Sequence, residues 1–428
     1  MMTNGNQKRT VSVGYACLAL GVKDASMKTC RLQGASPERL DALTAHNLNA
    51  LEAMIRYNAE SGIRLFRISS DLVPFGSHPA VSFEWRESFA SRLSEIGRLI
   101  GKSSLRVSMH PGQYTVLNST NAEVVARSIA DLVYHERVLS ALRTDSSHKI
   151  VLHIGGVSGN KKEALTRFRT NFAYLNDAVK SRLVIENDDR YFHIADVIET
   201  GHRLGIPVVF DNLHHTINGC GPASSYEWIR LCGDTWRAHD GRQKIHYSQQ
   251  DEMKRAGAHS KTVRIREFLE FAAPLSDLDI MLEVKDKNLS AMKCALCLNQ
   301  NGSIQKLEKQ WRLYKYLVLE KNPSGYQAIR ELLKVKSAYP AAEFFEIIEA
   351  SLAKDENTGA AVNAAEHVWG YLKGVCTIKE RAGFEKFLGS YQTGRIPLSR
   401  MKSFLQRLSV KYQMTYLLDS YYFIDGIC

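Results

Sequence analysis

The feature that most constrains the fold of this 428-residue chain is a repeated alternation of short apolar runs with helical patterns. The runs, each five or six residues long, are 11–15, 64–69, 105–109, 149–154, 182–186, 207–211, 243–247 and 279–284. Segments between them, such as 38–60 and 122–142, carry apolar residues at helical spacing. Strands that alternate with helices form parallel βαβ units, and eight units over roughly 280 residues predict a (β/α)8 TIM barrel.

The chain changes character after residue 300. Apolar residues recur at helical spacing in 304–320, 326–336 and 341–353, and the segment 363–423 is also rich in helical patterns. We therefore expect a barrel domain over 1–300 and a smaller all-α domain over 301–428. The second domain has no pair of histidines at metal-binding spacing, so the sequence assigns it no chemistry.

The chain is basic, with a formal net charge of +11 and a pI of about 9.1. Lys and Arg exceed Asp and Glu by 18 to 13 in residues 301–428, a net +5, which leaves +6 for residues 1–300. The excess is spread over both parts rather than held in a tail, so it lies on folded surfaces. A basic surface favours a polyanionic partner, because bound phosphates release their counterions.

Cysteine usage and the first residues indicate the cell compartment. The eight cysteines are scattered, no apolar signal segment precedes them, and no run of 18 apolar residues predicts a membrane span. We expect reduced thiols in a cytoplasmic, monomeric protein. The Cys294-x-x-Cys297 pair has no second pair or His-x-x-His nearby, so we interpret it as two small apolar residues on a helix.

Polar residues lie in or just beyond the last part of nearly every predicted strand. They are His78, His110, His153, Glu186, Asp211, His214, Lys244, His246, His259 and Glu283. The carboxyl ends of barrel strands converge on one face, where active sites of such barrels lie. We therefore expect these side chains to meet at one mouth of the barrel.

Imidazoles and carboxylates in one pocket have two uses, acid–base catalysis and metal binding. A single histidine at a strand end is more often a buried polar residue than a ligand. Glu186 and Glu283 differ, because each follows an apolar run and a buried carboxylate is costly unless it is paired or metal-bound. So many donors exceed what proton transfer needs and match two or three divalent ions, and the absence of thiolates permits both Mn²⁺ and Zn²⁺.

Lys244 stands two residues before His246, and residues i and i+2 of a strand face the same side. An ammonium group would therefore point into the barrel near the expected cations. Three interpretations remain open at this point: the lysine pairs with carboxylates, it is carboxylated on Nζ, or it extends to the rim.

Nine motifs, in order along residues 11–300, resemble the ultraviolet damage endonuclease family. The motifs are GYACLAL (14–20), FRISSDLVPFGSHP (66–79), SMHPGQYTVLNS (108–119), VLHIGG (151–156), IENDDR (185–190), VVFDNLHH (208–215), KIHYSQQD (244–251), GAHS (257–260) and LEVKDK (282–287). The last 70 or so residues are similar to a bacterial helical domain of unknown function.

The resemblance implies a (β/α)8 barrel related to endonuclease IV that acts on damaged double-stranded DNA. Such enzymes nick the backbone immediately 5′ of cyclobutane dimers, 6–4 photoproducts and some abasic sites with three divalent ions, commonly Mn²⁺. By resemblance the ligands are His78, His110, His153, Glu186, Asp211, His214, His246, His259 and Glu283. Lys244 matches a lysine that is carboxylated in the family.

The resemblance also identifies residues that probe the lesion. Gln113 and Tyr114 are similar to a pair that wedges into the duplex, and Tyr15 matches a tyrosine at the same site. A wedge selects poorly stacked bases because they cost less to extrude. Ala19 stands where some members carry an asparagine, which puts the preferred lesion in doubt.

These observations together predict in-line hydrolysis of a phosphodiester, with Glu186 as a bridging carboxylate and Asp211, Glu283 and Lys244 at the catalytic centre. The alternatives are a general apurinic-site nuclease of the endonuclease IV type and a sugar isomerase, which also uses a barrel with two metals. A non-catalytic DNA-binding module gives no reason for nine candidate ligands at strand ends.

Overall fold

The computed structural model describes residues 11–79, 81, 83–299 and 301–424. These residues form two compact units. One unit holds the chain up to Val263 together with Phe271–Met292, and the other holds Arg264–Glu270 together with the chain from Lys293. The division passes through helix α11 (Asn288–Leu298), whereas the sequence placed the domain boundary at residue 300.

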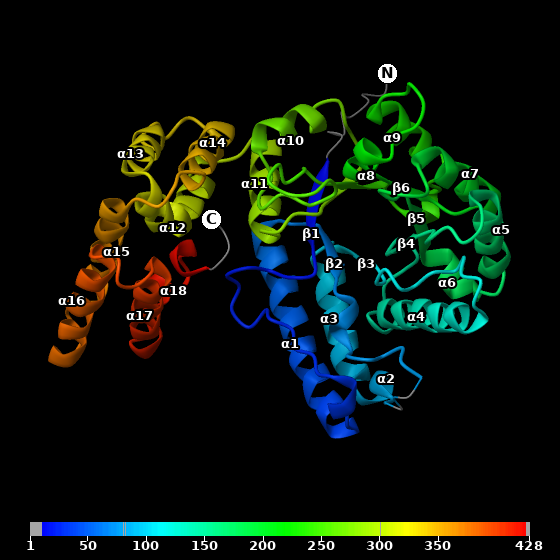
Figure 1. Cartoon of the computed structure of the whole chain (residues 1–428), viewed down its shortest axis with the longest axis horizontal. Helices are drawn as coiled ribbons and strands as arrows, with labels where there is room; N and C mark the ends of the chain where they lie inside the picture. Colours follow the sequence, from blue (N-terminus) through cyan, green and yellow to red (C-terminus); the bar gives the residue numbers. More distant parts are fainter. Residues whose placement is uncertain (1–10, 80, 82, 300, 425–428) are drawn as a thin grey trace, which may run out of the picture. The chain divides into compact units, whose positions relative to one another are not determined.

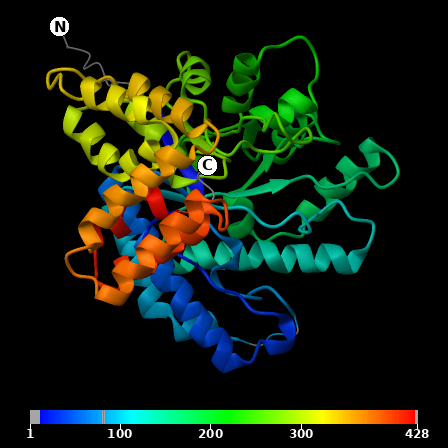
Figure 2. The same ribbon diagram turned by 60° about the vertical axis from the view of Figure 1, so that its left-hand side comes forward.

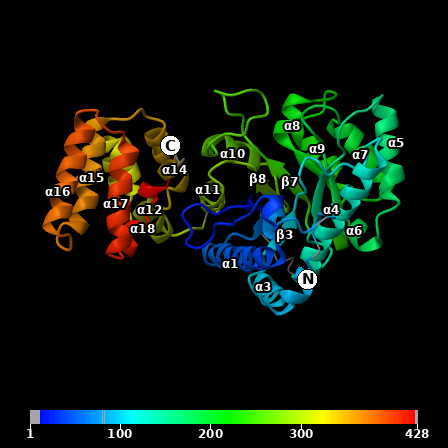
Figure 3. The ribbon, with the colours of Figure 1, turned by 60° about the horizontal axis from the view of Figure 1, so that its bottom comes forward.

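The first unit is a closed barrel of eight parallel strands in chain order, which confirms the predicted (β/α)8 fold. The strands are β1 (Ser12–Ala16), β2 (Leu65–Ile68), β3 (Arg106–Met109), β4 (Ile150–His153), β5 (Leu183–Glu186), β6 (Val208–Asp211), β7 (Lys244–Tyr247) and β8 (Asp279–Leu282). Figures 1 and 3 show the strands in the interior with helices around them. Each strand is short and apolar, as strands covered on both faces must be.

Helices follow the strands. They are α1 (Pro37–Ser61), α2 (Trp85–Ser88), α3 (Ala90–Lys102), α4 (Ala122–Ala141), α5 (Lys161–Phe172), α6 (Asp177–Arg182), α7 (Ile194–Leu204), α8 (Asn212–Ile217), α9 (Ser225–Gly233) and α10 (Ile265–Ala272). Polar residues begin several of them: the side chain of Asn121 accepts hydrogen bonds at the start of α4, and that of Ser224 at the start of α9. These caps satisfy backbone N–H groups that a helix start leaves without partners.

Alternation along the strands sets what faces the barrel interior. The valines two residues before His153, Glu186 and Asp211 form a buried cluster of Val151, Val184 and Val209. Residues i and i+2 share a face of a strand, so the polar strand ends lie on the same interior side, directly above this apolar layer. The layer removes water from one side of the polar groups.

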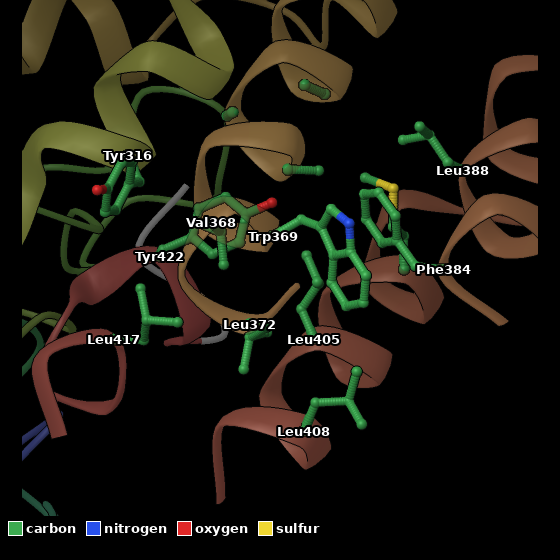
Figure 4. Packing of buried hydrophobic residues seen from close by; sticks show 14 of the residues in the cluster. Tyr316, Val368, Trp369, Leu372, Phe384, Leu388, Leu405, Leu408, Leu417 and Tyr422 are labelled. Atoms are coloured by element: carbon green, nitrogen blue, oxygen red, sulfur yellow. The ribbon is translucent and has the colours of Figure 1, made fainter. Parts of the chain in front are cut away.

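The second unit is all-helical, as predicted. Besides most of α10 and the end of α11 it contains α12 (Ile304–Lys321), α13 (Pro323–Leu332), α14 (Ala341–Leu352), α15 (Thr358–Leu372), α16 (Ile378–Gln392), α17 (Leu398–Lys411) and α18 (Thr415–Leu418). Helices α15, α16 and α17 pack against one another, and they belong to the orange to red part of the chain in Figures 2 and 3. Its core includes Trp369 stacked on Phe384, with ring centroids 4.4 Å apart (Figure 4).

The described helices were compared with the length and hydropathy of a membrane-spanning helix. No described helix combines the length and the hydropathy that crossing a membrane requires. The seven cysteines in the described part of the chain are free, and Cys428 lies outside it.

Candidate metal centre

Four adjacent strands deliver the central polar groups. His153, Glu186 and Asp211 are the last residues of β4, β5 and β6, and His246 is the third residue of β7. The strand register pairs His153 with Glu186 and Asp211 with His246. These four side chains come from segments far apart in the chain and nevertheless lie next to one another.

Glu186 is the centre of this arrangement. Its Oε2 lies 3.2 Å from His110 Nε2 and 3.7 Å from His153 Nε2, and its Oε1 lies 2.8 Å from His246 Nδ1. Two overlapping groups have donor atoms within 4.8 Å of one another: His110, His153 and Glu186, and Glu186, Asp211 and His246. Glu186 belongs to both groups, so its carboxylate could contribute to a cation held by either one.

Glu283, just after β8, extends the cluster. Its Oε1 lies 3.4 Å from His246 Nδ1, and its Oε2 lies 4.0 Å from His259 Nδ1. Arg67, on β2, forms an ion pair with the same carboxylate. The carboxylate therefore shares its charge between two imidazoles and one guanidinium group.

His214 and Asp211 close the cluster on the opposite side. His214 Nδ1 lies 3.8 Å from Asp211 Oδ1 and 3.9 Å from Glu186 Oε1. The same Nδ1 donates a hydrogen bond to the backbone oxygen of Asn187 at 2.9 Å. In the neutral ring this bond makes Nε2 of His214 the acceptor, as in metal-binding histidines.

The ring of His110 supplies the observation that best tests whether the site fits a cation. Its Nδ1 donates to the backbone oxygen of Pro111 at 3.1 Å, so in the neutral ring Nε2 is an acceptor. This acceptor lies 3.2 Å from Glu186 Oε2, another acceptor. Two lone pairs so close repel each other unless a proton or a cation lies between them. Asp211 Oδ2 and His246 Nε2 are buried and have no hydrogen-bond partner among the described residues, which fits the same conclusion.

The pKa values of these groups follow from burial and from their neighbours. Burial alone would raise the pKa of Glu186, but His246 and His153 hold it well below its usual range. Burial lowers the pKa of His153 to about 4. For His214 burial is outweighed by the Asp211 and Glu186 carboxylates, which raise its pKa to about 9. At neutral pH the site therefore holds an ionised Glu186 and a neutral His153, both in the state that binds metal ions. His214 is protonated at that pH and must lose its proton to bind an ion.

The sequence was compared with known protein families and with individual proteins. The UV-endonuclease UvdE family matches residues 11–314. The chain belongs to the UvdE family. The UV DNA damage endonuclease of Clostridium perfringens is 35% identical over 399 residues, which cover 91% of this chain and 96% of that protein. The corresponding Bacillus cereus enzyme is 32% identical and covers 70% of this chain and 98% of that protein.

A solved structure of a similar protein supports the same family assignment. A crystal structure of SacUVDE shares 38% sequence identity and a TM-score of 0.65, and it covers 68% of this chain and 98% of that chain. Residues 315–425 match a separate description, a protein family of unknown function, DUF1722. The UvdE match thus covers the barrel, and the helical unit carries no assigned activity.

Lys244 lies at the start of β7, inside this UvdE barrel. Its side chain is fully buried, and Nζ makes no hydrogen bond with any described residue. Burial and the cation of Arg106 lower the pKa of Lys244 well below its usual range. Of the three interpretations, extension to the rim is excluded by burial, and pairing with a carboxylate is not observed among the described residues.

His78 and Tyr15 are two predicted residues outside the two donor groups. His78 is in neither group of donor atoms, and it lines a different cavity together with Tyr114 and Thr115. Tyr15 is fully buried, and its ring packs on Phe66 with centroids 5.1 Å apart. Alternation explains this position, because Ala16 faces the interior and Tyr15 must then face the helices. The ring of Tyr15 is therefore not accessible in this structure, and its contact with DNA stays a prediction.

Gln113 and Tyr114 lie in the loop that follows β3. Gln113 lines a cavity of about 350 Å³ whose other walls include His110, His153 and His214. Tyr114 is 72% exposed. The turn that carries both residues is anchored to α4, because Thr115 donates a 2.6 Å hydrogen bond to Asp131 of that helix. An exposed aromatic ring on an anchored turn is suited to stacking.

Three functional residues escaped the sequence interpretation. Arg67 neutralises Glu283. The amide side chain of Asn187 bonds both N and O of Asp211, at 2.9 and 3.1 Å, and that of Asn212 bonds both N and O of Ser248, at 2.7 and 2.9 Å. The two amides continue the β5–β6 and β6–β7 hydrogen bonding beyond the strands. They therefore fix the strand ends that carry the cluster.

The ion pair between Arg67 and Glu283 leads to a stability prediction. Both side chains are about 15% exposed or less, so Arg67→Met leaves a largely buried carboxylate without its strongest partner. We expect a loss of about 3–5 kcal/mol, as when other buried pairs are broken. Urea unfolding of Arg67→Met, Glu283→Gln and the double variant checks this value. Additive effects of the two changes would show that the residues do not interact.

Proposed function

We propose that the chain nicks DNA immediately 5′ of cyclobutane dimers and 6–4 photoproducts, and at abasic sites, by metal-assisted hydrolysis. Membership in the UvdE family makes it a UV-damage repair nuclease and decides against the sugar isomerase. The single observation that carries the multi-metal mechanism is Glu186, whose two oxygens each face imidazoles in a different donor group.

The donor set suits a cluster of three Mn²⁺ ions, with Zn²⁺ as the alternative, because it contains only nitrogen and oxygen ligands. The ligands we propose are His78, His110, His153, Glu186, Asp211, His214, His246, His259 and Glu283. When bound, such ions polarise the scissile phosphate and lower the pKa of a bound water. Of these residues, His78 is assigned from the family resemblance alone.

The protein's own groups do the positioning. Glu186, Asp211 and Glu283 supply negative charge beneath the phosphate, and the valine layer excludes water below them. Arg67 and the Asn187 and Asn212 amides hold the carboxylates in place. Gln113 and Tyr114 fill the space that a flipped lesion leaves, which selects damage by the ease of unstacking.

The proposed partner is damaged double-stranded DNA, which the net charge of +11 favours. We propose that the enzyme acts in the cytoplasm as a monomer. The test is incision of duplex oligonucleotides that carry one defined cyclobutane dimer, 6–4 photoproduct or abasic site, with metal analysis of the same preparation. Incision on the 5′ side that leaves 3′-hydroxyl and 5′-phosphate ends supports the proposal. Incision of the abasic duplex alone would instead identify an enzyme of the endonuclease IV type.

Tyr114 gives a prediction on substrate selection. Tyr114→Ala removes an exposed ring, and base–aromatic stacking contributes about 1–3 kcal/mol, so we expect kcat/KM on photoproduct duplexes to fall about ten- to hundred-fold. Tyr174→Ala is the matched control, because Tyr174 is 71% exposed but lies at the end of α5, outside the entrance. Equal effects of the two substitutions would argue against the wedge.

Lys244 gives a second prediction. A buried amine with a lowered pKa is in the neutral form that adds carbon dioxide, and the resulting carbamate would supply an anion to the cluster. We expect a carbamate signal in the ¹³C NMR spectrum of protein equilibrated with ¹³C-bicarbonate. The signal should be missing from Lys244→Met and present in Lys285→Met, which removes an exposed lysine. A spectrum without that signal in the unaltered protein leaves Lys244 as an amine.

A further inference from the structure

Tyr371 is an exposed aromatic residue of the helical unit and lies outside that unit's buried core. Tyr371, near the end of α15, is 45% exposed and does not belong to the cluster of buried residues. Its ring stacks on Tyr416 of α18, with centroids 5.3 Å apart and planes at 28°, and its hydroxyl lies 3.0 Å from that of the buried Tyr316. The ring is therefore already ordered, so a planar partner can stack on it at a small cost in side-chain entropy.

Cations surround these rings. Lys315 Nζ lies 4.6 Å from the ring centroid of Tyr316 and 4.9 Å from that of Tyr416, and Arg312 lies 5.3 Å from that of Tyr416. Lys309, Arg312 and Lys315 follow one another on α12 at intervals of three residues. Residues at this interval are neighbours on a helix surface. They extend the positive charge from the tyrosines along the helix.

Nearby carboxylates do not neutralise this charge completely. Arg312 pairs with Asp419 at 2.8 Å, but Lys315 forms no ion pair with any described residue. Glu308, on the same helix, is already paired with Lys336. Burial and the hydrogen bond with Tyr371 raise the pKa of Tyr316, so this phenol stays neutral and adds no negative charge.

A second tyrosine–lysine contact in the same unit shows the difference. Lys411 lies 5.0 Å from the ring centroid of Tyr412, and Glu380 accepts 2.6 Å hydrogen bonds from both residues. The Glu380 carboxylate therefore neutralises Lys411 and also accepts the hydrogen bond of the Tyr412 hydroxyl. Lys315 has no such carboxylate, and an anion from another molecule would complete its surroundings.

We propose that Lys309, Arg312, Lys315, Tyr371 and Tyr416, here called the tyrosine–cation surface, bind single-stranded DNA. Phosphates contact Lys309 and Lys315, with the paired Arg312 between them, and an unstacked base stacks on Tyr371. This combination binds single strands without reading their sequence. Duplex DNA offers phosphates but no free base face, so the aromatic part of the surface selects single strands. The inference does not depend on the incision chemistry proposed for the barrel.

The experiment uses the full chain with EDTA and a fluorescein-labelled oligodeoxythymidylate of about 12 nucleotides, within the site size of single-strand binders. Fluorescence anisotropy gives Kd as a function of salt. We expect Tyr371→Ala to weaken binding about ten-fold, Tyr371→Phe to keep it within about two-fold, and Lys315→Ala to reduce the salt slope by about 0.7. Lys411→Ala is the matched control, because its charge is already paired with Glu380, and it should leave Kd and slope unchanged.

The outcomes separate this surface from the barrel's own DNA contacts. Photoproduct incision by Tyr371→Ala should stay within about two-fold of the unaltered protein, since the residue lies outside the barrel unit. Loss of single-strand binding with Tyr114→Ala, together with no effect of Tyr371→Ala, would overturn the proposal. So would a Kd for oligouridylate more than ten-fold lower than that for the DNA strand, since the ligand would then be RNA.

Discussion

Glu186→Gln is expected to lower kcat/KM for incision of a photoproduct duplex by at least about 10³-fold, which corresponds to about 4 kcal/mol of transition-state stabilisation. The substitution keeps the size of the side chain but replaces one oxygen by an NH₂ group, which cannot bind a cation. Because Glu186 belongs to both donor groups, the loss of its negative charge weakens cation binding by each of them. Metal analysis of the purified variant should therefore show fewer bound ions per chain.

The matched control for this change is Glu199→Gln on α7, where the carboxylate is 59% exposed and pairs with Arg203 on the same helix. It should incise DNA as the unaltered protein does. Circular dichroism of both variants checks that the barrel has folded. A Glu186→Gln protein that keeps its metal content and incises within about ten-fold would remove Glu186 from the bridging position.

Much of this centre could be predicted from the sequence, because two simple regularities place it. Parallel strands of a barrel end on one face, and residues i and i+2 of a strand share a side. His153, Glu186 and Asp211 each end an apolar run, so their convergence followed once the barrel was recognised. The same rule placed Lys244 inside the barrel beneath His246, and the structure has it buried there.

The remaining features depend on partners distant in the chain. An arginine within a strand, such as Arg67, gives no local sign of its role, and its partner Glu283 is 216 positions away. Asn187 and Asn212 resemble ordinary loop residues until the next strand lies beside them. Tyr15 shows the opposite case: the resemblance placed it at the lesion, whereas the small interior residues next to it turn its ring toward the helices.

The helical unit shows why exposure cannot be deduced from pattern alone. Tyr316, Tyr371 and Tyr416 occupy similar positions in amphipathic sequences, and only the packing separates the buried Tyr316 from the exposed Tyr371. Their contacts join α12, α15 and α18, which are up to 100 residues apart in the chain. A basic, aromatic composition therefore could not distinguish a core from a binding surface.

Removal of divalent ions is expected to abolish incision completely while leaving weak DNA binding. Without cations, Glu186, Asp211 and Glu283 place like charges next to one another beneath the phosphate, and the acceptors His110 Nε2 and Glu186 Oε2 face each other at 3.2 Å. The measurement is incision of photoproduct duplex after dialysis against EDTA, followed by titration with Mn²⁺, Zn²⁺ and Mg²⁺. Mn²⁺ should restore activity, and Mg²⁺ should do so poorly, because it prefers oxygen ligands to imidazole.

The chelated protein also offers a readout that does not involve activity. A metal that binds only the folded chain stabilises it by about 2.7 kcal/mol when its concentration is 100 times Kd, so the barrel's thermal transition should rise as Mn²⁺ is added. His153→Ala should reduce this rise, whereas His239→Ala, which removes a histidine exposed outside the cluster, should leave it unchanged. Undiminished incision by the chelated enzyme, or a transition that Mn²⁺ does not move, would mean that the imidazoles and carboxylates meet for a purpose other than holding cations.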